Sequence, residues 1–583
     1  MKRFSVLFAL ALAACLGAAE PEASADDAAP VVRTVSTGSL SGRTSEGVHI
    51  WRAVPFAAAP VGALRWRAPR PPEPWAGVRD AARPSPWCPQ ILSALDGVNQ
   101  SRWGELAGQE DCLFLDVYAP AMAASAAAQA RLPVMMWIHG GSNVWGRAEQ
   151  YNASELSRRH NVIVVVVQYR LGPLGWFAHP ALREGGELSE DASPNFGTLD
   201  NIRALEWIRD EIAAFGGDPN LITIFGESAG GQNVAALLAS PRASGLFHRA
   251  IVQSGSFDTT PLAEAEGLDS NARSDSGIAV AARMLADGNV TGQALRYVPL
   301  EAIFASYDTS RGAFDPPRVI ADGIVLPAGG IEAVLGNAET YNDVPVMLGS
   351  NRDETKLFNA LNPELTRRVL WVFPQARDPD LYDAFSNYQS RMWRASAVDD
   401  PAELMWAAGN PSIYTYRFDW DDQGKILFTD LGQLLGAAHS MEIPFVFGHF
   451  RLLGSFDRFA FTRANRDERL ELSAAMMSYW VNFARTGAPG RGVDGSLPEW
   501  NAARSAAGDA AIMILDAASD GGIRIADDVE TPQRIVRDLF SDPRLGTDAE
   551  RCRVFRATER WNPELVGMDG ARCAGAEGVL ATQ

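Results

Sequence analysis

Residues 221–239 read LITIFGESAGGQNVAALLA, and this stretch decides the fold. Residues 221–225 form a short apolar run typical of a buried strand, and residues 232–239 have the composition of a helix. Between them, residues 226–230 match the pattern G-x-S-x-G. A strand, a tight turn with small residues and a helix together predict a nucleophile elbow, which exposes the hydroxyl of Ser228. The alternative is an ordinary glycine–serine turn, since the pattern alone occurs by chance in one of a few chains of this length.

Three further apolar runs occupy residues 133–138, 162–167 and 345–348. Each is four to six residues long and does not alternate with polar residues, which predicts strands covered on both faces, as in a parallel sheet. Residues 199–215 have apolar positions three and four apart and end at two glycines, which predicts a helix. Alternating strands and helices predict an α/β fold with a doubly wound sheet. The alanine-rich residues 121–130 are expected to form a loop.

The composition excludes several classes of protein. The 583 residues are 47% hydrophobic and 21% charged, which excludes a disordered, collagen-like or multi-span membrane protein. The chain carries 71 acidic and 52 basic side chains, and its formal net charge of −19 repels phosphate backbones. We therefore expect no nucleic-acid partner. We also expect no cofactor and no metal; the oligomeric state is left open.

The first residues resemble an export signal. Lys2 and Arg3 precede an apolar run at residues 4–14 that is too short to span a bilayer. Residues 12–15, LAAC, resemble the bacterial lipoprotein signal, which predicts a signal peptide at residues 1–14, a lipidated Cys15 and a flexible tether at residues 15–30. Such a protein would be anchored in the bacterial cell envelope. Ordinary cleavage after Ala19, giving a periplasmic or secreted protein, is the alternative.

Four cysteines remain after Cys15, an even number in an oxidising compartment. Three pairings are open to them, and the sequential one closes two short loops, each worth on the order of 3 kcal/mol. A zinc site is the alternative, but the chain has no C-x-x-C and no paired histidines beside these cysteines. We therefore predict disulfides among the four: Cys88, Cys112, Cys552 and Cys573.

A serine nucleophile needs a base, because its alkoxide is not available at neutral pH. Spacing alone does not choose among the seven histidines or the 71 carboxylates of the chain. The histidines are His49, His139, His160, His179, His248, His439 and His449.

Further motifs resemble those of a known family, and this resemblance singles out one histidine and one carboxylate. Residues 225–231 (FGESAGG), preceded by 215–219 (FGGDP), are similar to the type-B carboxylesterase/cholinesterase family of α/β-hydrolases. Residues 110–120 (EDCLFLDVYAP) match the second signature of that family. Residues 351–354 (NRDE) resemble its acid motif, and residues 439–448 (HSMEIPFVFG) resemble its histidine motif. The resemblance extends from residue 31 to about residue 500.

The resemblance implies an α/β-hydrolase fold, with a large, mostly parallel central sheet flanked by helices and long insertions forming a gorge or cap. Residues 31–583 would then be one domain, with an atypical tail from about residue 540. Carried over position by position, Ser228 is the nucleophile, His439 the general base and acid, and Glu354 the orienting carboxylate, with Asp353 as the alternative acid. The resemblance also agrees with a Cys88–Cys112 disulfide and gives no support for Cys552–Cys573.

The oxyanion hole implied by the resemblance consists of backbone N–H groups of Gly141, Ser142 and Ala229. The family usually has a third glycine and then an aromatic residue where this chain has Ser142 and Asn143. A backbone donor tolerates serine if its backbone angles permit. Esters of tertiary alcohols, whose hydrolysis goes with an all-glycine hole, are therefore less expected as substrates.

The predicted activity is hydrolysis of small-molecule carboxylic esters through an acyl-enzyme on Ser228. Alternatives with the same triad are a carbamate, amide or lactone hydrolase and a choline esterase. Trp103 lies close to where cholinesterases keep their choline-site tryptophan, but we interpret it as a packing residue. A non-catalytic binding protein is the remote alternative, because such relatives lose the serine or its partners.

Overall fold

The structure is a computed structural model. It describes residues 30–93, 98–269, 273–286, 288–307, 318–370, 373–451, 454, 457–503, 511–559, 561, 562, 565, 568 and 573. The predicted signal peptide, Cys15 and nearly all of the predicted tether lie outside the described residues. No described helix is both long and apolar enough to cross a bilayer.

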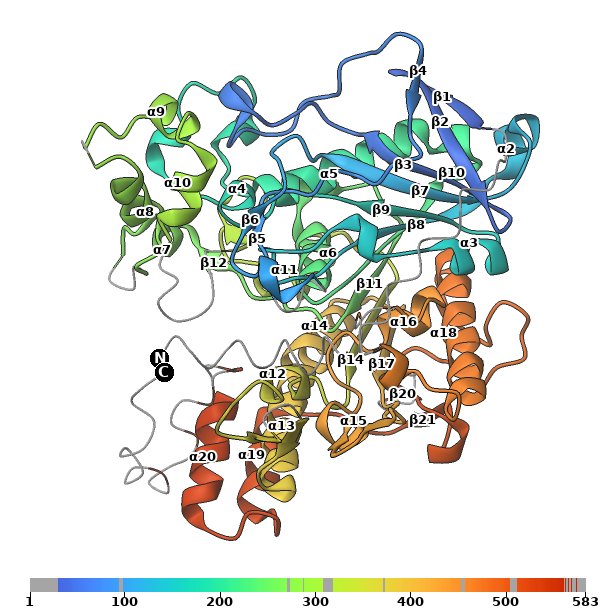
Figure 1. The fold of residues 1–583 in the computed structure, drawn as a ribbon, viewed down its shortest axis with the longest axis vertical. Helices are drawn as coiled ribbons and strands as arrows, with labels where there is room; N and C mark the ends of the chain where they lie inside the picture. Colours follow the sequence, from blue (N-terminus) through green and yellow to red (C-terminus); the bar gives the residue numbers. More distant parts are fainter. Residues whose placement is uncertain are drawn as a thin grey trace.

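A single large sheet forms the centre of the described chain (Figure 1). Its middle strands run parallel from β9 to β20, whereas the strands at both edges pair antiparallel. In spatial order the strands are β1 (Val31–Val35), β2 (Gly38–Ser45), β3 (Val48–Pro55), β7 (Phe114–Pro120), β9 (Ile163–Val167), β8 (Leu132–Ile138), β10 (Gly217–Glu227), β11 (Arg249–Gln253), β14 (Val346–Asn351), β17 (Ile413–Phe418), β20 (Ile512–Leu515) and β21 (Arg524–Ala526), with β4 (Val78–Asp80) paired to β2. This sheet confirms the predicted fold class.

The central strands are buried on both faces, as their unbroken apolar runs predict. Within β8, Met136 points into one hydrophobic core and its neighbour Trp137 into another. The first core lies between the sheet and helices α5 (Phe196–Glu211) and α6 (Ala229–Ala239). The second lies between the sheet and helices α16 (Ile443–Phe447) and α18 (Arg466–Thr486). Because side chains alternate along a strand, every second residue serves each core.

Helices connect the strands and cover both faces of the sheet. The longer ones are α2 (Ala124–Ala130), α3 (Ser154–His160), α5 (Phe196–Glu211), α6 (Ala229–Ala239), α8 (Gly277–Met284), α10 (Leu300–Ala305), α13 (Pro379–Arg394), α14 (Asp400–Ala407), α18 (Arg466–Thr486), α19 (Pro532–Ser541) and α20 (Asp548–Glu559). Shorter ones are α4 (Gly172–Gly175), α7 (Leu262–Glu266), α9 (Gly292–Arg296), α11 (Glu332–Leu335), α12 (Lys356–Asn359), α15 (Leu431–Leu434), α16 (Ile443–Phe447) and α17 (Asp457–Ala460). The predicted helix at residues 199–215 is α5 with the single turn that follows it.

The alanine-rich stretch corrects one prediction. Residues 124–130 form helix α2 rather than a loop. Alanine has the highest helix propensity of all residues, so a run of alanines favours a helix even without apolar periodicity.

Both predicted disulfides are confirmed in the sequential pairing. Cys88 bonds to Cys112 and Cys552 bonds to Cys573, and all four residues are buried. The second bridge begins on α20, which packs with α19 beside α13, in the yellow and red region of Figure 1.

Candidate active site

Ser228 occupies a sharp turn between a strand and a helix. Strand β10 ends at Glu227 and helix α6 begins at Ala229, so a single residue makes the turn. Its φ of 59° and ψ of −125° lie in a region that serine rarely adopts. Ser228 is partly exposed, whereas the residues on either side are buried. The turn therefore presents one hydroxyl group from an otherwise covered backbone.

The two glycines of the motif are required because neighbouring backbone atoms leave no room for a side chain. A Cβ on Gly226 would lie 2.6 Å from the carbonyl carbon of Gly230, and a Cβ on Gly230 would lie 2.0 Å from the carbonyl oxygen of Ile138. No larger residue fits where the strand, the turn and the end of β8 meet. The spacing of the motif thus follows from contacts between backbones.

The structure brings His439 and Glu354 together. Nδ1 of the imidazole lies 2.6 Å from Oε2 of Glu354, and both side chains are buried. The other oxygen of Glu354 accepts a hydrogen bond of 2.6 Å from the backbone N–H of Asn351, at the end of β14. The alternative acid, Asp353, instead forms ion pairs with Arg352 and Lys356.

The imidazole also faces the residue before the serine. Nε2 of His439 lies 3.1 Å from Oε1 of Glu227, and the hydroxyl of Ser440 donates a hydrogen bond of 2.7 Å to the same oxygen. In the described part of the chain, no hydrogen bond joins the Ser228 hydroxyl to His439. Such bonds often form only when the substrate is bound. The contacts with Glu227 nevertheless place the imidazole beside the turn that carries Ser228.

A third buried acidic side chain completes this cluster. Glu442 accepts hydrogen bonds from the side-chain amides of Asn351, at 2.6 Å, and Gln253, at 3.2 Å. Sequence reasoning missed Glu227 and Glu442 as partners of the imidazole. The only available signal was position, since Glu227 lies within the G-x-S-x-G motif and Glu442 lies three residues after His439.

Burial and mutual repulsion shift the pKa values within the cluster. Burial raises the pKa of Glu227, and it raises the pKa of Glu442 to about 8, helped by the charges of Glu227 and Glu354. Burial alone would lower the pKa of His439. The charges of Glu227 and Glu354 outweigh it and raise the pKa of His439 to about 9. The cluster therefore favours the imidazolium form.

The turn that carries Gly141 and Ser142, two residues of the predicted oxyanion hole, comes close to the serine. A Cβ on Gly140 would be 3.1 Å from the Cβ of Ser228, so the turn after β8 approaches the nucleophile directly. The N–H groups of Gly141, Ser142 and Ala229 donate no hydrogen bond to any residue that the structure describes. Asn143 fastens this turn to α6, because its amide group bonds to the side chains of Gln232 and Asn233. Three backbone donors thus remain available, two in the turn after β8 and one at the first residue of α6.

Ser142 and Asn143, which depart from the usual pattern of the family, both adopt positive φ angles of 53° and 59°. The left-handed conformation costs a non-glycine residue about 1–2 kcal/mol. The turn therefore has the backbone form that glycine would provide, with an exposed serine side chain in addition.

Aromatic side chains pack around the imidazole, and sequence reasoning missed them. The ring centroids of Trp393 and Phe358 lie 4.8 Å and 5.6 Å from that of His439. Trp103, interpreted from the sequence as a packing residue, is 41% exposed, so that interpretation is wrong. Backbone hydrogen bonds between Leu92, Gly104 and Glu105 hold the loop of Trp103, which leaves its ring unburied.

One group of described carboxylates is close enough together to hold a metal ion: Asp421, Asp422 and Asp520. Asp421 already forms an ion pair of 2.6 Å with Arg352. The imidazole nitrogens contact other carboxylates, those of Glu227 and Glu354.

Comparison with known proteins shows the family of the chain. The sequence model described as "Carboxylesterase family" matches residues 28–369 and 363–519. A para-nitrobenzyl esterase of Bacillus subtilis is 34% identical, covering 78% of this chain and 90% of that protein. A human cocaine esterase is 33% identical, covering 81% and 86%. A solved PNB esterase superposes with a TM-score of 0.65 at 30% identity, covering 87% of this chain and 98% of that one.

The sheet and the serine turn define the chain as an α/β-hydrolase. Within that class, the chain belongs to the carboxylesterase family. The relatives and the solved structure named above are carboxylic ester hydrolases.

The oxyanion turn can be tested at Gly141. Its φ is +102°, and a Cβ there would lie 2.1 Å from the carbonyl oxygen of Trp145. Gly141→Ala should shift the turn and misplace a donor, which lowers kcat by about 10²–10³-fold with a smaller change in KM. Gly336→Ala is the control, because no atom lies within 4 Å of the added Cβ. A wild-type kcat in Gly141→Ala would contradict the assignment.

The buried cluster predicts the pH dependence of activity. A base must be neutral to accept a proton, so kcat/KM should fall as the pH drops through the raised pKa of His439. Glu227→Gln removes a negative charge 3.1 Å from the imidazole, which destabilises the imidazolium and lowers that pKa.

The acid limb of the kcat/KM profile should therefore move to lower pH by about one pH unit or more in Glu227→Gln. Glu110→Gln is the control, since that carboxylate bonds to Arg65 rather than to the imidazole. An unmoved limb, or a move to higher pH, would show that Glu227 does not stabilise the imidazolium.

Proposed function

We propose that this chain hydrolyses small-molecule carboxylic esters through an acyl-enzyme on Ser228, with His439 as the base and Glu354 as its orienting partner. One observation carries the proposal. A partly exposed serine in a strained strand–helix turn directly follows Glu227, whose carboxylate lies 3.1 Å from a buried imidazole that is in turn bonded to Glu354 at 2.6 Å. This is the arrangement that serine hydrolases need for acyl transfer.

In the first step, Nε2 of His439 accepts the proton of Ser228 while its oxygen attacks the ester carbonyl carbon. The N–H groups of Gly141, Ser142 and Ala229 stabilise the negative oxygen of the tetrahedral intermediate. The imidazolium then donates its proton to the leaving alcohol. A water molecule repeats the sequence on the acyl-serine, which releases the acid and regenerates the hydroxyl.

Glu354 and Glu227 have different roles in this scheme. Glu354 accepts a hydrogen bond from Nδ1, which fixes the tautomer whose Nε2 carries the lone pair that accepts the serine proton. Glu227 lies on the Nε2 side and stabilises the imidazolium once it forms. The same charge raises the pKa of the resting base, so it also limits activity at any pH below that raised pKa.

The similarity to a para-nitrobenzyl esterase favours p-nitrobenzyl esters as the first substrates to test. Carbamates, amides and lactones form a second candidate class, because the same three side chains would attack them. A panel of p-nitrophenyl esters, carbamates and anilides, compared by kcat/KM, separates the two classes. We expect the esters to be preferred.

Replacing Ser228 by alanine should abolish ester turnover and leave the thermal unfolding midpoint nearly unchanged, because the side chain is partly exposed. An organophosphate should label the wild-type protein on the peptide that contains Ser228 and leave the variant unlabelled. Ser101→Ala, at an exposed serine, is the control and should keep full activity. Turnover that survives in Ser228→Ala would refute the mechanism.

We further propose that the protein is exported and anchored by lipid on Cys15. Support comes from Lys2 and Arg3 before an apolar run, and from the LAAC sequence that ends at Cys15. In a bacterial host with lipoprotein processing, we expect the protein in the membrane fraction with an acylated Cys15 by mass spectrometry. Cys15→Ser should move it to the soluble fraction. A mature protein beginning at Glu20 would establish ordinary cleavage instead.

A further inference from the structure

An aromatic stack extends outward from the imidazole and ends on the C-terminal extension, by which we mean the described residues after 519. Trp393 lies 4.8 Å from His439, and its other neighbour, Trp561, lies 4.7 Å away with the two indole planes 26° apart. Phe358 lies beside both Trp393 and His439, at 6.3 Å and 5.6 Å. Trp561 lies beyond residue 519, where the match to the carboxylesterase family ends.

Trp393 is held firmly in this stack. It lies in the last turn of α13, and its indole N–H donates a hydrogen bond of 3.1 Å to the carbonyl oxygen of Gly255. The helix itself begins with a capped turn, since the side chain of Asp378 accepts a hydrogen bond from the N–H of Leu381. A ring fixed at both its edge and its helix is a stable surface for Trp561.

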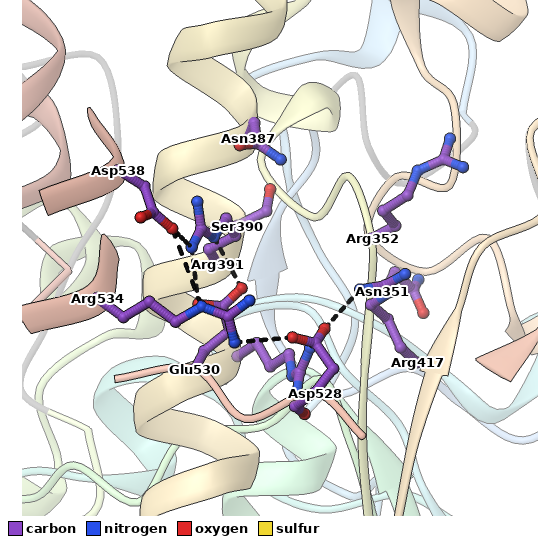
Figure 2. Close-up of a pocket in the computed structure, with 11 residues that line it drawn as sticks. Asn351, Arg352, Asn387, Ser390, Arg391, Arg417, Asp528, Glu530, Arg534 and Asp538 are labelled. Atoms are coloured by element: carbon purple, nitrogen blue, oxygen red, sulfur yellow. Dashed lines mark hydrogen bonds and ion pairs between the residues drawn. The ribbon is translucent and has the colours of Figure 1, made fainter. Parts of the chain in front are cut away.

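Ion pairs join the C-terminal extension to α13 on either side of Trp393. Arg391 binds Glu530 at 2.8 Å and Asp538 at 2.7 Å, and Arg394 binds Asp528 at 2.8 Å. These groups line a cavity of about 340 Å³ between the extension, α13 and the end of β14 (Figure 2). The arginines that line the cavity form ion pairs with carboxylates. These ion pairs attach the extension to α13 and leave no uncompensated charge for a ligand among the described residues that line the cavity.

An apolar core and a disulfide complete the attachment. The core contains buried residues from all three helices: Tyr382, Phe385, Tyr388 and Met392 of α13, Ile535 and Leu539 of α19, and Val554 and Phe555 of α20. The Cys552–Cys573 bridge links α20 to the chain beyond Trp561, and both sulfur-bearing residues are buried. Trp561 lies between the two bridged positions, so the bridge limits the movement of its ring.

The stack is not closed off from solvent. Phe358 is 39% exposed, and Trp393 and Trp561 are each only partly buried, whereas His439 is 5% exposed. An ester whose carbonyl lies at Ser228 must place one of its substituents next to the imidazole that serves both proton transfers. Exposed faces and edges of aromatic rings in this position offer apolar and offset-stacking contacts to that substituent.

We propose that Trp561 is a specificity-determining residue, which completes an aromatic wall beside His439 and favours esters that carry a flat aromatic group. The inference rests on the proposed function, because the wall is defined relative to the proposed base. Phe358 and Trp393 form the inner part of the wall. The C-terminal extension supplies the outer part, and the Cys552–Cys573 disulfide keeps it in place.

The test compares kcat and KM of Trp561→Ala with those of the wild type on two pairs of esters. Ethyl acetate and benzyl acetate differ in the alcohol, whereas p-nitrophenyl acetate and p-nitrophenyl phenylacetate differ in the acyl group. Aromatic substituents on the contacted side should lose about 2- to 12-fold in kcat/KM, mainly through KM, as expected for one aromatic contact. Ethyl acetate should change less than twofold. The series that responds identifies whether the alcohol or the acyl group contacts the wall.

Two variants control for packing. Trp561→Phe keeps an aromatic ring and should restore most of the preference. Trp406→Ala removes a tryptophan of α14 that is 38% exposed and should leave the preference unchanged. The acid limb of the pH profile should not move in Trp561→Ala, because the ring contacts the substrate and not the proton. An equal loss for all four esters, no loss for any, or a shifted limb without a change in preference would overturn the proposal.

A third variant covers the case in which Trp561→Ala does not fold. Replacing both Cys552 and Cys573 by serine keeps the ring but loosens its segment, and should lower the preference for aromatic esters in the same direction. Unchanged preference in a folded double variant would overturn the role of the disulfide. Failure of the proposed function is seen separately, as turnover that persists in Ser228→Ala.

Discussion

The turn at Ser228 is the constraint on which the rest of the structure depends. Three backbones meet there so closely that Gly226 and Gly230 admit no side chain, and Ser228 takes a φ of 59°. A residue in such a conformation costs about 1–3 kcal/mol, so it persists only where its surroundings determine it. Parallel strands on both sides of β10 provide that rigidity. The oxyanion turn and the imidazole are then placed by direct contact with this turn.

The second organising feature is a buried imidazole among three carboxylates. Burial opposes every charge in the cluster, and hydrogen bonds from Asn351 and Gln253 partly offset that cost for Glu442. The negative charges stabilise the imidazolium, which forms when Ser228 attacks, but they also stabilise it in the resting enzyme. The arrangement therefore favours the charge distribution of the transition state at the expense of activity below the raised pKa of His439.

The sequence predicted local elements well because their signals are local. Unbroken apolar runs predicted strands covered on both faces, and the spacing of the motif predicted the turn at Ser228. Two predictions were wrong: the alanine run forms α2, because alanine favours a helix without apolar periodicity, and Trp103 is 41% exposed rather than packed. Contacts across long separations were missed, because nothing near Trp393 or Trp561 in the chain indicates that their rings meet.

By itself, the sequence determined the alternation of strands and helices, the glycine pattern of the turn and the number of cysteines available for pairing, because each depends on neighbouring residues or on composition. The resemblance to a family was needed to single out His439 and Glu354 among seven histidines and 71 carboxylates. Only the tertiary structure decided that Glu227 faces the imidazole, that Asp353 turns to Arg352 and Lys356, and that Trp561 reaches Trp393. The physical reason is that these contacts depend on how strands β10 and β14, helix α13 and the C-terminal extension pack together, which no short segment encodes.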